Sequence, residues 1–447
     1  MIMRRILDAA RQGADARDRF ADLLRFVSIA MVVLGHWLMA VILVRDGTLV
    51  VGRIHAVVPW ARWATWVFQV MPIFFVVGGF VNARSWAHAT AHSQSWSAWV
   101  RRRAERLLSP LFPLLVLWAI VIPGLLVLGF PSRYVHVASQ SAFVPIWFIG
   151  AYLAVILLVP LTWRLHRRVG FFGIVAIFAA AAVVDAMARH GVPYVGYANV
   201  ILVWGGIHQL GYFWHEGRLP QRGWIGVAWA ALALSLLYAL VTLGDYPVNM
   251  VAARAGERSN ASPPNIALFA LALAQLGLAV AARGPLGRWL ARPRVWASLS
   301  AAGAVTFTIF VWHLTAMFLV AAVAYRLDLG LLTPTLDARW WALRPLWVGA
   351  CAPLLAGLVL AFRRFDRAAP PAVETGPSRT LVGLGATLLG ITWLVRRGPY
   401  DPDTPWPLAV GAAAALVVGL ALLGAIRRPG QRALRHTPGG DRGPQTG

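Results

Sequence analysis

The chain has 447 residues, of which 59% are hydrophobic and 13% are charged, and its mean hydropathy is +0.65. Soluble domains carry roughly 25% charged residues, so this composition indicates an integral membrane protein. The net charge of +24 is compatible with nucleic-acid binding, but the arginines occupy the short gaps between apolar stretches, where positive charges collect at membrane surfaces. No nucleic-acid partner is therefore expected.

The amino terminus and the single cysteine define the class further. Polar residues continue through Arg25 and no small-residue cleavage site follows, so the first apolar stretch is predicted to be a retained helix rather than a signal peptide. Cys351 is the only cysteine, which excludes an intrachain disulfide and a thiolate metal cluster.

Twelve apolar stretches follow one another along the chain and are long enough, or nearly so, to cross a membrane. The eleventh is the shortest. The fold class expected is therefore all-α, a polytopic bundle of membrane helices. The stretches lie at about residues 20–44, 65–83, 107–130, 142–163, 170–188, 195–213, 224–243, 264–282, 299–325, 341–362, 380–395 and 406–426.

Orientation follows from the arginines, which are concentrated in alternate gaps between the stretches. This asymmetry predicts a multi-pass protein of the bacterial inner membrane with both termini in the cytoplasm. Arg396 and Arg397 are the exception, since the count of stretches places them outside. The sequence after Pro429 is rich in Gly, Pro and Arg without an apolar period, which is typical of disorder.

His36 lies near the middle of the first apolar stretch, eleven residues after Arg25. In a helix this spacing leaves both side chains on one face, about 20° apart and about 16 Å along the axis. With Arg25 at the membrane surface, His36 would lie about halfway through a hydrocarbon core of roughly 30 Å, where an ionisable group indicates a functional site. Two interpretations stay open: a general base in a buried cavity, or a neutral histidine bonded to a neighbouring helix.

Other ionisable residues lie inside later stretches. His313, in FTIFVWHL, is predicted to reach a depth similar to that of His36, either in a shared polar cavity or as a packing partner. His208 lies near the inner end of its stretch and is predicted to be structural or interfacial. Asp185 is the only acidic residue well inside a stretch, toward its outer end.

Arg103 and Arg106 are three residues apart in RRRAERLLSPLFP, just before the third stretch, and share one helical face. Such a pair can hold the phosphates of a nucleotide-like cofactor. The same basic cluster also follows from the positive-inside rule, so the sequence leaves both interpretations open.

Three further features have ordinary structural explanations beside functional ones. The adjacent Gly78 and Gly79 favour close helix contact. Trp147 suits either an interfacial belt or a cavity wall. His88 and His92 are four apart in a polar segment and are predicted to be solvated rather than metal-bound, so no metal site is expected.

Taken in chain order, these features resemble the acyltransferase-3 family of integral membrane proteins. The residues that carry the resemblance are Arg25 with ten residues before His36, FFVVGGF, the Arg103 and Arg106 pair before LLSPLFP, IWFI and the late VWHL. They cover roughly residues 19–314, about two-thirds of the chain. Two positions depart from the family pattern: Gly78 stands where the family often has serine, and Phe310 where it has an aromatic hydroxyl.

The resemblance implies an O-acyltransferase with a core of about ten membrane helices. Similar proteins move an acyl group, often acetyl from acetyl-CoA, from the cytoplasmic side to a hydroxyl of a sugar, glycolipid or other envelope molecule. The implied roles are catalytic base for His36, its partner toward the cofactor for Arg25, CoA phosphate binding for Arg103 and Arg106, and substrate binding for Trp147 and His313.

The resemblance also divides the chain. It implies a cytoplasmic segment at 1–19, an acyltransferase domain at 20–365, two additional helices within 366–426 and a disordered cytoplasmic tail at 427–447. Partners would be acyl-CoA, a sugar or lipid-linked acceptor and membrane lipids. The sequence does not specify an oligomeric state.

Two other function classes compete with the enzyme. A transporter or flippase of an envelope precursor suits twelve spans, but proton-coupled carriers place several carboxylates along their pathway and this chain offers only Asp185. A non-catalytic scaffold or sensor would not need a cytoplasmic arginine pair aligned with a buried histidine. The sequence therefore favours the acyltransferase.

Overall fold

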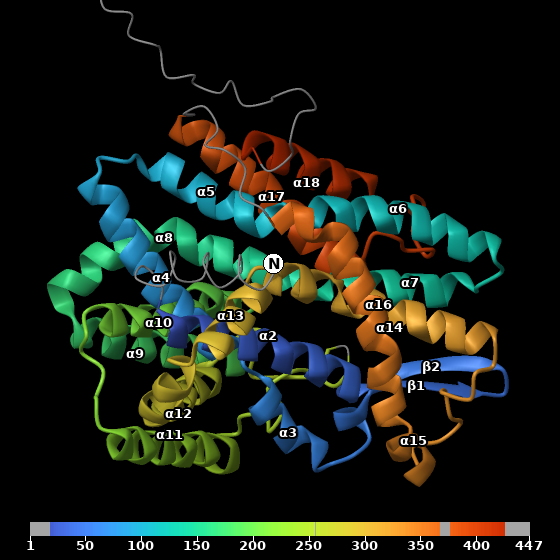
Figure 1. Cartoon of the computed structure of the whole chain (residues 1–447), viewed down its shortest axis with the longest axis horizontal. Coiled ribbons are helices and arrows are strands. Elements are labelled where there is room, and N and C mark those ends of the chain that lie inside the picture. Colours follow the sequence, from blue (N-terminus) through green and yellow to red (C-terminus); the bar gives the residue numbers. More distant parts are fainter. Residues whose placement is uncertain (1–17, 255, 367–375, 425–447) are drawn as a thin grey trace, which may run out of the picture.

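The computed structural model describes residues 18–254, 256–366 and 376–424. Within these ranges the chain is a bundle of helices with one two-stranded hairpin (Figure 1). The predicted all-α class is confirmed. The predicted tail at 427–447 and all but the last residues of the segment at 1–19 lie outside the described residues.

Most of the longer α-helices follow the predicted apolar stretches. The α-helices are α2 (Arg19–Met39), α3 (Ala61–Phe68), α4 (Met71–Ala91), α5 (Trp96–Leu108), α6 (Leu111–Val127), α7 (Ser132–Phe143), α8 (Trp147–Val169), α9 (Phe171–Arg189), α10 (Asn199–His215), α11 (Gly223–Leu243), α12 (Ile266–Leu290), α13 (Pro293–Gly303), α14 (Thr306–Arg326), α15 (Ala338–Ala342), α16 (Arg344–Phe362), α17 (Pro377–Arg397) and α18 (Val410–Leu422). By contrast, α5, α7, α13 and α15 lie mainly in the predicted gaps between the stretches.

Ten helical segments in the described part of the chain are long and apolar enough to cross a membrane. Two predicted spans form shorter helices, since α10 has 17 residues and α18 has 13. The prediction that the eleventh stretch is a short span is wrong, because it forms α17 with 21 residues. The twelfth stretch forms the shorter helix instead, because a Pro-rich segment precedes α18 and delays its start.

The first apolar stretch ends earlier than predicted and continues as a β-hairpin. Asp18 caps α2 through its Oδ1, which accepts hydrogen bonds from the amides of Phe20 and Ala21. After Met39 the chain forms β1 (Ala40–Arg45), which pairs antiparallel with β2 (Thr48–Arg53). Asp46 and Gly47 make the turn with φ of 49° and 69°, the geometry that an Asp-Gly pair favours in a two-residue hairpin.

Because of this hairpin, His36 lies in the last turn of α2 and not in its middle. The prediction of a mid-helix histidine is therefore wrong, although α2 is unbroken from Arg25 to His36 and keeps both residues on one face. Residues 40–45 leave the helix because a run rich in β-branched residues, followed by an Asp-Gly turn, favours a strand.

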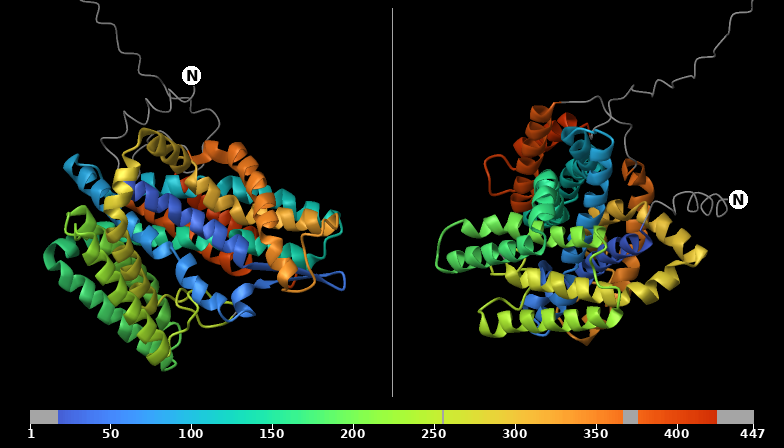
Figure 2. Two further views of the ribbon diagram at one scale, coloured as in Figure 1. Left: turned by 60° about the horizontal axis from the view of Figure 1, so that its bottom comes forward. Right: turned by 90° about the vertical axis from the view of Figure 1, so that its left-hand side faces the viewer.

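The interior of the bundle is made by α2, α4, α8, α10 and α14, which pack on one another. The most apolar part of the α3–α4 segment is 72% buried, against 22% for α11. Figures 1 and 2 show α11 beside α12 at one side of the molecule and α17 beside α18 at the other. The two C-terminal helices therefore lie at the periphery, where α17 packs against α5, α7 and α8.

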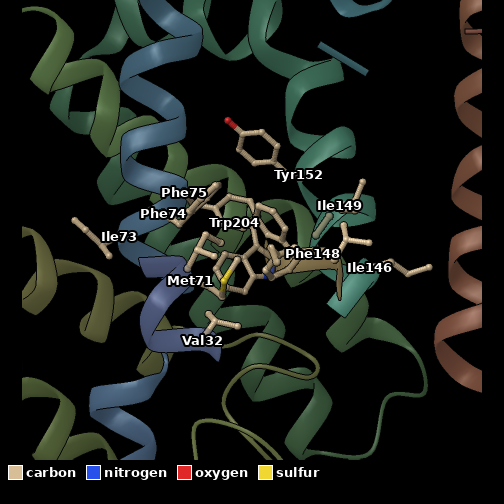
Figure 3. Packing of buried hydrophobic residues seen from close by; sticks show 14 of the residues in the cluster. Val32, Met71, Ile73, Phe74, Phe75, Ile146, Phe148, Ile149, Tyr152 and Trp204 are labelled. Atoms are coloured by element: carbon tan, nitrogen blue, oxygen red, sulfur yellow. The ribbon is translucent and has the colours of Figure 1, made fainter. Parts of the chain in front are cut away.

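Aromatic side chains fill the space between α4 and α8 (Figure 3). Phe75 meets Phe148 edge-on with ring centroids 5.6 Å apart, and stacks on Trp204 of α10 with centroids 4.4 Å apart. Such pairs contribute about 0.5–1.5 kcal/mol each beyond the area they bury. They hold α8, and with it Trp147, against α4 and α10.

Candidate functional site

Helices α2 and α14 lie side by side and bring His36 and His313 together. Nδ1 of His36 is 2.7 Å from Nε2 of His313, and the two rings are nearly parallel, with planes inclined by 12°. The two histidines therefore lie at one level, as the sequence predicts. Their chemical roles follow from their hydrogen bonds.

The tautomer of each ring can be assigned from these hydrogen bonds. Nδ1 of His313 is 2.6 Å from the backbone carbonyl oxygen of Phe310. A carbonyl only accepts, so Nδ1 of His313 donates and its Nε2 must accept from Nδ1 of His36 when both rings are neutral. This leaves Nε2 of His36 with a free lone pair, which is the state required of a proton acceptor.

A cavity opens beside His36, with about 570 Å³ of space between protein atoms. Five segments of the chain contribute its walls: α2, the end of α3 with the start of α4, the start of α8, the loop after α11, and α14. The lining residues are Val32, Gly35, His36, Met39, Thr65, Phe68, Gln69, Met71, Trp147, Phe148, Val251 and Phe310.

The cavity contains two of the predicted site residues, His36 and Trp147, and both are half-buried. His313 does not line it. Its side chain is fully buried behind His36, so it can act on a substrate only through the His36 ring.

Tryptophan indoles hold the backbone around the histidine pair. Trp37 donates to the carbonyl oxygen of His313 at 3.0 Å, and Trp347 of α16 donates to the carbonyl oxygen of Trp37 at 3.1 Å. Trp118 of α6 donates to Oγ1 of Thr315 at 3.1 Å. These bonds tie α2, α14, α16 and α6 together at the level of the site, which limits movement of the two rings.

The predicted arginines lie toward the other end of α2. The Arg103 guanidinium, half-buried, lies over the Trp99 ring at 5.5 Å. The positive charges of Arg25, Arg102 and Arg106 lie close enough to repel the charge of Arg103. The structure thus gathers Arg25, from α2, with the arginines of α5.

Two carboxylates lie near this arginine group. Glu105 of α5 interacts with the charges of Arg101 and Arg102. Arg25 reaches Asp22 at 3.7 Å, a partly exposed contact of small energetic value. In the ranges that the structure describes, neither Arg103 nor Arg106 forms an ion pair with a carboxylate. Guanidinium groups without a carboxylate partner, such as those of Arg103 and Arg106, are chemically suited to bind an anion such as a phosphate.

A buried polar network links α4, α8 and α10, and the sequence analysis did not identify it. Asn82 donates from Nδ2 to the Tyr152 hydroxyl and to Nε2 of His208, each at 3.1 Å. A Cβ at Gly78 would lie 2.5 Å from the Tyr152 hydroxyl, so this hydroxyl fills the space that a serine at position 78 would use. Asn82 is a polar amide within an apolar stretch, a signal that could have marked it.

Gly79 has the packing role predicted for it. A Cβ at Gly79 would lie 1.7 Å from the carbonyl oxygen of His208, and one at Gly211 would lie 2.1 Å from that of Val76. The backbones of α4 and α10 therefore touch at this pair of glycines.

Asp185 is buried and its hydrogen bonds are satisfied. It accepts from Nδ2 of Asn199 at 2.7 Å, from the Tyr246 hydroxyl at 3.1 Å and from the amide of Ile266 at 2.9 Å. Burial and the Asp185 charge raise the pKa of Tyr246 to about 12, so this hydroxyl keeps its proton and donates at neutral pH. The carboxyl serves to join α9, α10 and α12.

No group of three or more His, Cys, Asp or Glu within residues 18–254, 256–366 and 376–424 is placed to hold a metal ion. His88 and His92 are exposed, and Nδ1 of His92 is bonded to the carbonyl oxygen of His88 at 2.8 Å. A second cavity, of about 540 Å³, has almost entirely apolar walls from the hairpin, α6, α7 and α14 and shares no lining residue with the His36 cavity.

Comparison with known proteins gives one match. Residues 18–363 match the acyltransferase-3 family model, described as an acyltransferase domain, and this range contains every site residue named above. No curated protein and no solved structure matches the chain.

Proposed function

We propose, on the premise that this chain belongs to the acyltransferase-3 family, that it is an O-acyltransferase in which His36 acts as the general base. Family membership and the multi-span fold make the protein a membrane acyltransferase. The proposal adds that the acyl group, most simply acetyl, comes from acyl-CoA on the cytoplasmic side. The acceptor is a hydroxyl of an envelope sugar, glycolipid or similar molecule in a bacterial inner membrane.

One observation carries the proposal: Nε2 of His36 has a free lone pair beside a cavity, while its Nδ1 is bonded to His313. This is the arrangement of a base whose tautomer and ring orientation are fixed by a second group.

The reaction can be written with the residues in place. The acceptor oxygen attacks the thioester carbonyl carbon as Nε2 of His36 takes the hydroxyl proton. The carbon–sulfur bond then breaks, and the same proton passes to the departing sulfur, which gives an ester and a free thiol. While His36 carries the extra proton, its Nδ1–H remains bonded to Nε2 of His313, which stabilises the charged ring.

The arginine group supports binding of the donor from the opposite end of α2. Arg103 and Arg106, with Arg25 nearby, would hold the CoA phosphates. Arg25 precedes His36 by about 16 Å along α2, a distance that a thin pantetheine arm must span to present its thioester at the cavity. Trp147 would then contact the acceptor from the cavity wall.

The transporter or flippase alternative has less support. Asp185 is the carboxylate that a proton-coupled carrier would have to use, and it is bonded to three donors that join helices. It does not line the His36 cavity.

The experiment that tests the proposal follows labelled acetyl from acetyl-CoA into the lipids and glycans of membrane vesicles. Wild type is compared with His36→Ala and with His190→Ala, a control at an exposed histidine after α9. We expect label with wild type and the control, and a loss of about 10²- to 10⁴-fold in His36→Ala at equal membrane insertion. Equal labelling by His36→Ala would overturn the role of the base, and no label from any of several acyl-CoAs in acceptor-rich membranes would overturn the enzyme assignment.

A further inference from the structure

The hairpin that follows α2 places an arginine beside the cavity, at the end away from the Arg25 group. β2 ends at Arg53, which pairs in register with Ala40, the first residue of β1. Ala40 comes directly after Met39, and Met39 and His36 line the cavity. Arg53 therefore stands at the base of the hairpin, next to the last turn of α2.

Arg53 does not line the cavity itself, but it contacts the loop that forms part of the cavity wall. Nη1 of Arg53 donates to the carbonyl oxygen of Ala252, in the loop between α11 and α12. The preceding residue of this loop, Val251, is part of the cavity wall. Arg53 is exposed, so its remaining N–H groups are accessible to a ligand.

The acidic residues of this loop are bonded elsewhere. Glu257 accepts from Nδ2 of Asn249 at 3.0 Å and from the amides of Ala253 and Arg254 at 3.1 Å and 3.0 Å. Asp245 pairs with Arg258 at 3.2 Å. Among the residues whose positions are described, no carboxylate forms an ion pair with Arg53.

An exposed arginine with one bond to a backbone carbonyl retains several N–H donors in a planar fork. This fork matches a carboxylate or a phosphate, which it can bind through two parallel hydrogen bonds. A single hydroxyl cannot use it in the same way. Arg53 follows the end of α2 that is remote from the arginines proposed to hold the donor phosphates, so an anion bound there is assigned to the acceptor.

We propose that the acceptor carries a carboxylate or phosphate close to the acylated hydroxyl, and that Arg53 binds this anion. The inference rests on the proposed function, since it names the substrate class of the same site. Arg53 thereby selects anionic acceptors over neutral ones of the same size.

A second arginine of the hairpin provides a matched control. Arg45 ends β1, is also exposed, and also donates to a backbone carbonyl, that of Pro334 at 2.9 Å. It pairs in register with Thr48, five residues before Arg53 on β2, which is about 17 Å farther from the base of the hairpin. Loss of its charge should leave acceptor binding unchanged.

The test measures binding and transfer with the full-length protein in lipid nanodiscs. The probes are octyl β-glucuronide, which bears a carboxylate, octyl glucosyl phosphate, which bears a phosphodiester, and the neutral octyl β-glucoside. Each is titrated against wild type, Arg53→Gln and Arg45→Gln, and each is then offered as acceptor with labelled acetyl-CoA. Gln at position 53 keeps an N–H donor for the Ala252 carbonyl, and a thermal melt checks that the fold is retained.

We expect wild type and Arg45→Gln to bind one or both anionic probes at least about tenfold tighter than the neutral probe. Arg53→Gln should lose this preference. The probe whose binding weakens in Arg53→Gln shows whether Arg53 recognises a carboxylate or a phosphate. Equal binding of all probes by wild type, or a preference that survives in Arg53→Gln, would overturn the inference. Transfer without an anion preference would overturn it and leave the acyltransferase proposal standing. An Arg53-dependent preference without transfer to any probe would support anion binding by Arg53 and count against the acyltransferase proposal.

Discussion

His36 and His313 are 277 positions apart in the sequence, yet Nδ1 of the first lies 2.7 Å from Nε2 of the second. The contact aligns three groups in one direction: the Phe310 carbonyl fixes the proton on His313, and His313 fixes the proton on His36. The free lone pair on the cavity side is the product of this chain of bonds.

His313 is thus a positioning residue, and its substitution should separate geometry from packing. His313→Phe removes the acceptor for the His36 Nδ1–H and should lower kcat by about 10- to 100-fold. His313→Gln offers a carbonyl oxygen as acceptor in a similar volume and should recover part of the loss. The rate of acetyl transfer is measured against pH for both variants, because loss of the hydrogen bond should also move the pH profile. Equal activity of the Phe and Gln variants, with unchanged profiles, would contradict the assignment.

The arginine pair should act on the donor alone. The double variant Arg103→Ala with Arg106→Ala removes two positive charges. Within the described ranges, neither arginine forms an ion pair with a carboxylate that this change would break. The KM for acetyl-CoA should rise by at least tenfold while the KM for the acceptor stays within about twofold, because loss of one charge-assisted contact alone accounts for about 1.5–3 kcal/mol.

Arg167→Ala with Arg168→Ala is the matched control, since it removes two exposed arginines from the end of α8. It should leave both KM values unchanged. A parallel rise in donor and acceptor KM in the Arg103 and Arg106 variant would argue against phosphate binding.

Much of the site followed from the sequence because its signals are local. The spacing of Arg25 and His36 on one helix fixes their common face, and the similar positions of His36 and His313 in two stretches predict their common level. Ionisable residues inside apolar stretches are rare, so each one stands out in the sequence by itself.

The remaining features depend on partners that are distant in the sequence. His313 accepts the hydrogen bond from Nδ1 of His36, and this partner could be identified only from the packing of α2 against α14. The Asn82 network joins three helices, and no periodicity predicts which residues meet there. The hairpin is different, since an Asp-Gly pair flanked by apolar residues was visible at Asp46 and Gly47, and the length of the apolar run concealed it.

Asp185→Asn distinguishes a structural carboxyl from a proton pathway. Asparagine cannot accept from all three donors, so the variant should lose about 1–3 kcal/mol of stability and melt at a lower temperature. Acetyl transfer per folded molecule should stay within about twofold of wild type. Asp328→Asn, at an exposed position after α14, is the control and should not change the melting temperature. Abolished activity in a fully folded Asp185→Asn protein would favour the transporter class, in which this carboxylate carries the proton.

Gly211→Ala tests whether the contact between α4 and α10 supports the site. The added Cβ would lie 2.1 Å from the carbonyl oxygen of Val76 and 2.4 Å from the amide nitrogen of Phe80. These are backbone atoms, which cannot relieve the overlap by a change of rotamer. The helices must separate, at a cost of at least about 1–3 kcal/mol. Because α4 carries Met71 of the cavity wall and packs on α2, the melting temperature and kcat should fall together.

Gly205→Ala is the control on the same helix, because a Cβ at position 205 would meet no atom within 4 Å. Alanine is a better helix former than glycine, so this variant should melt at the wild-type temperature or slightly above it and keep its activity. If Gly211→Ala had the same melting temperature and kcat as Gly205→Ala, the two helices would have room to separate without disturbing the cavity. The close glycine contact would then be a consequence of packing and not a requirement of the site.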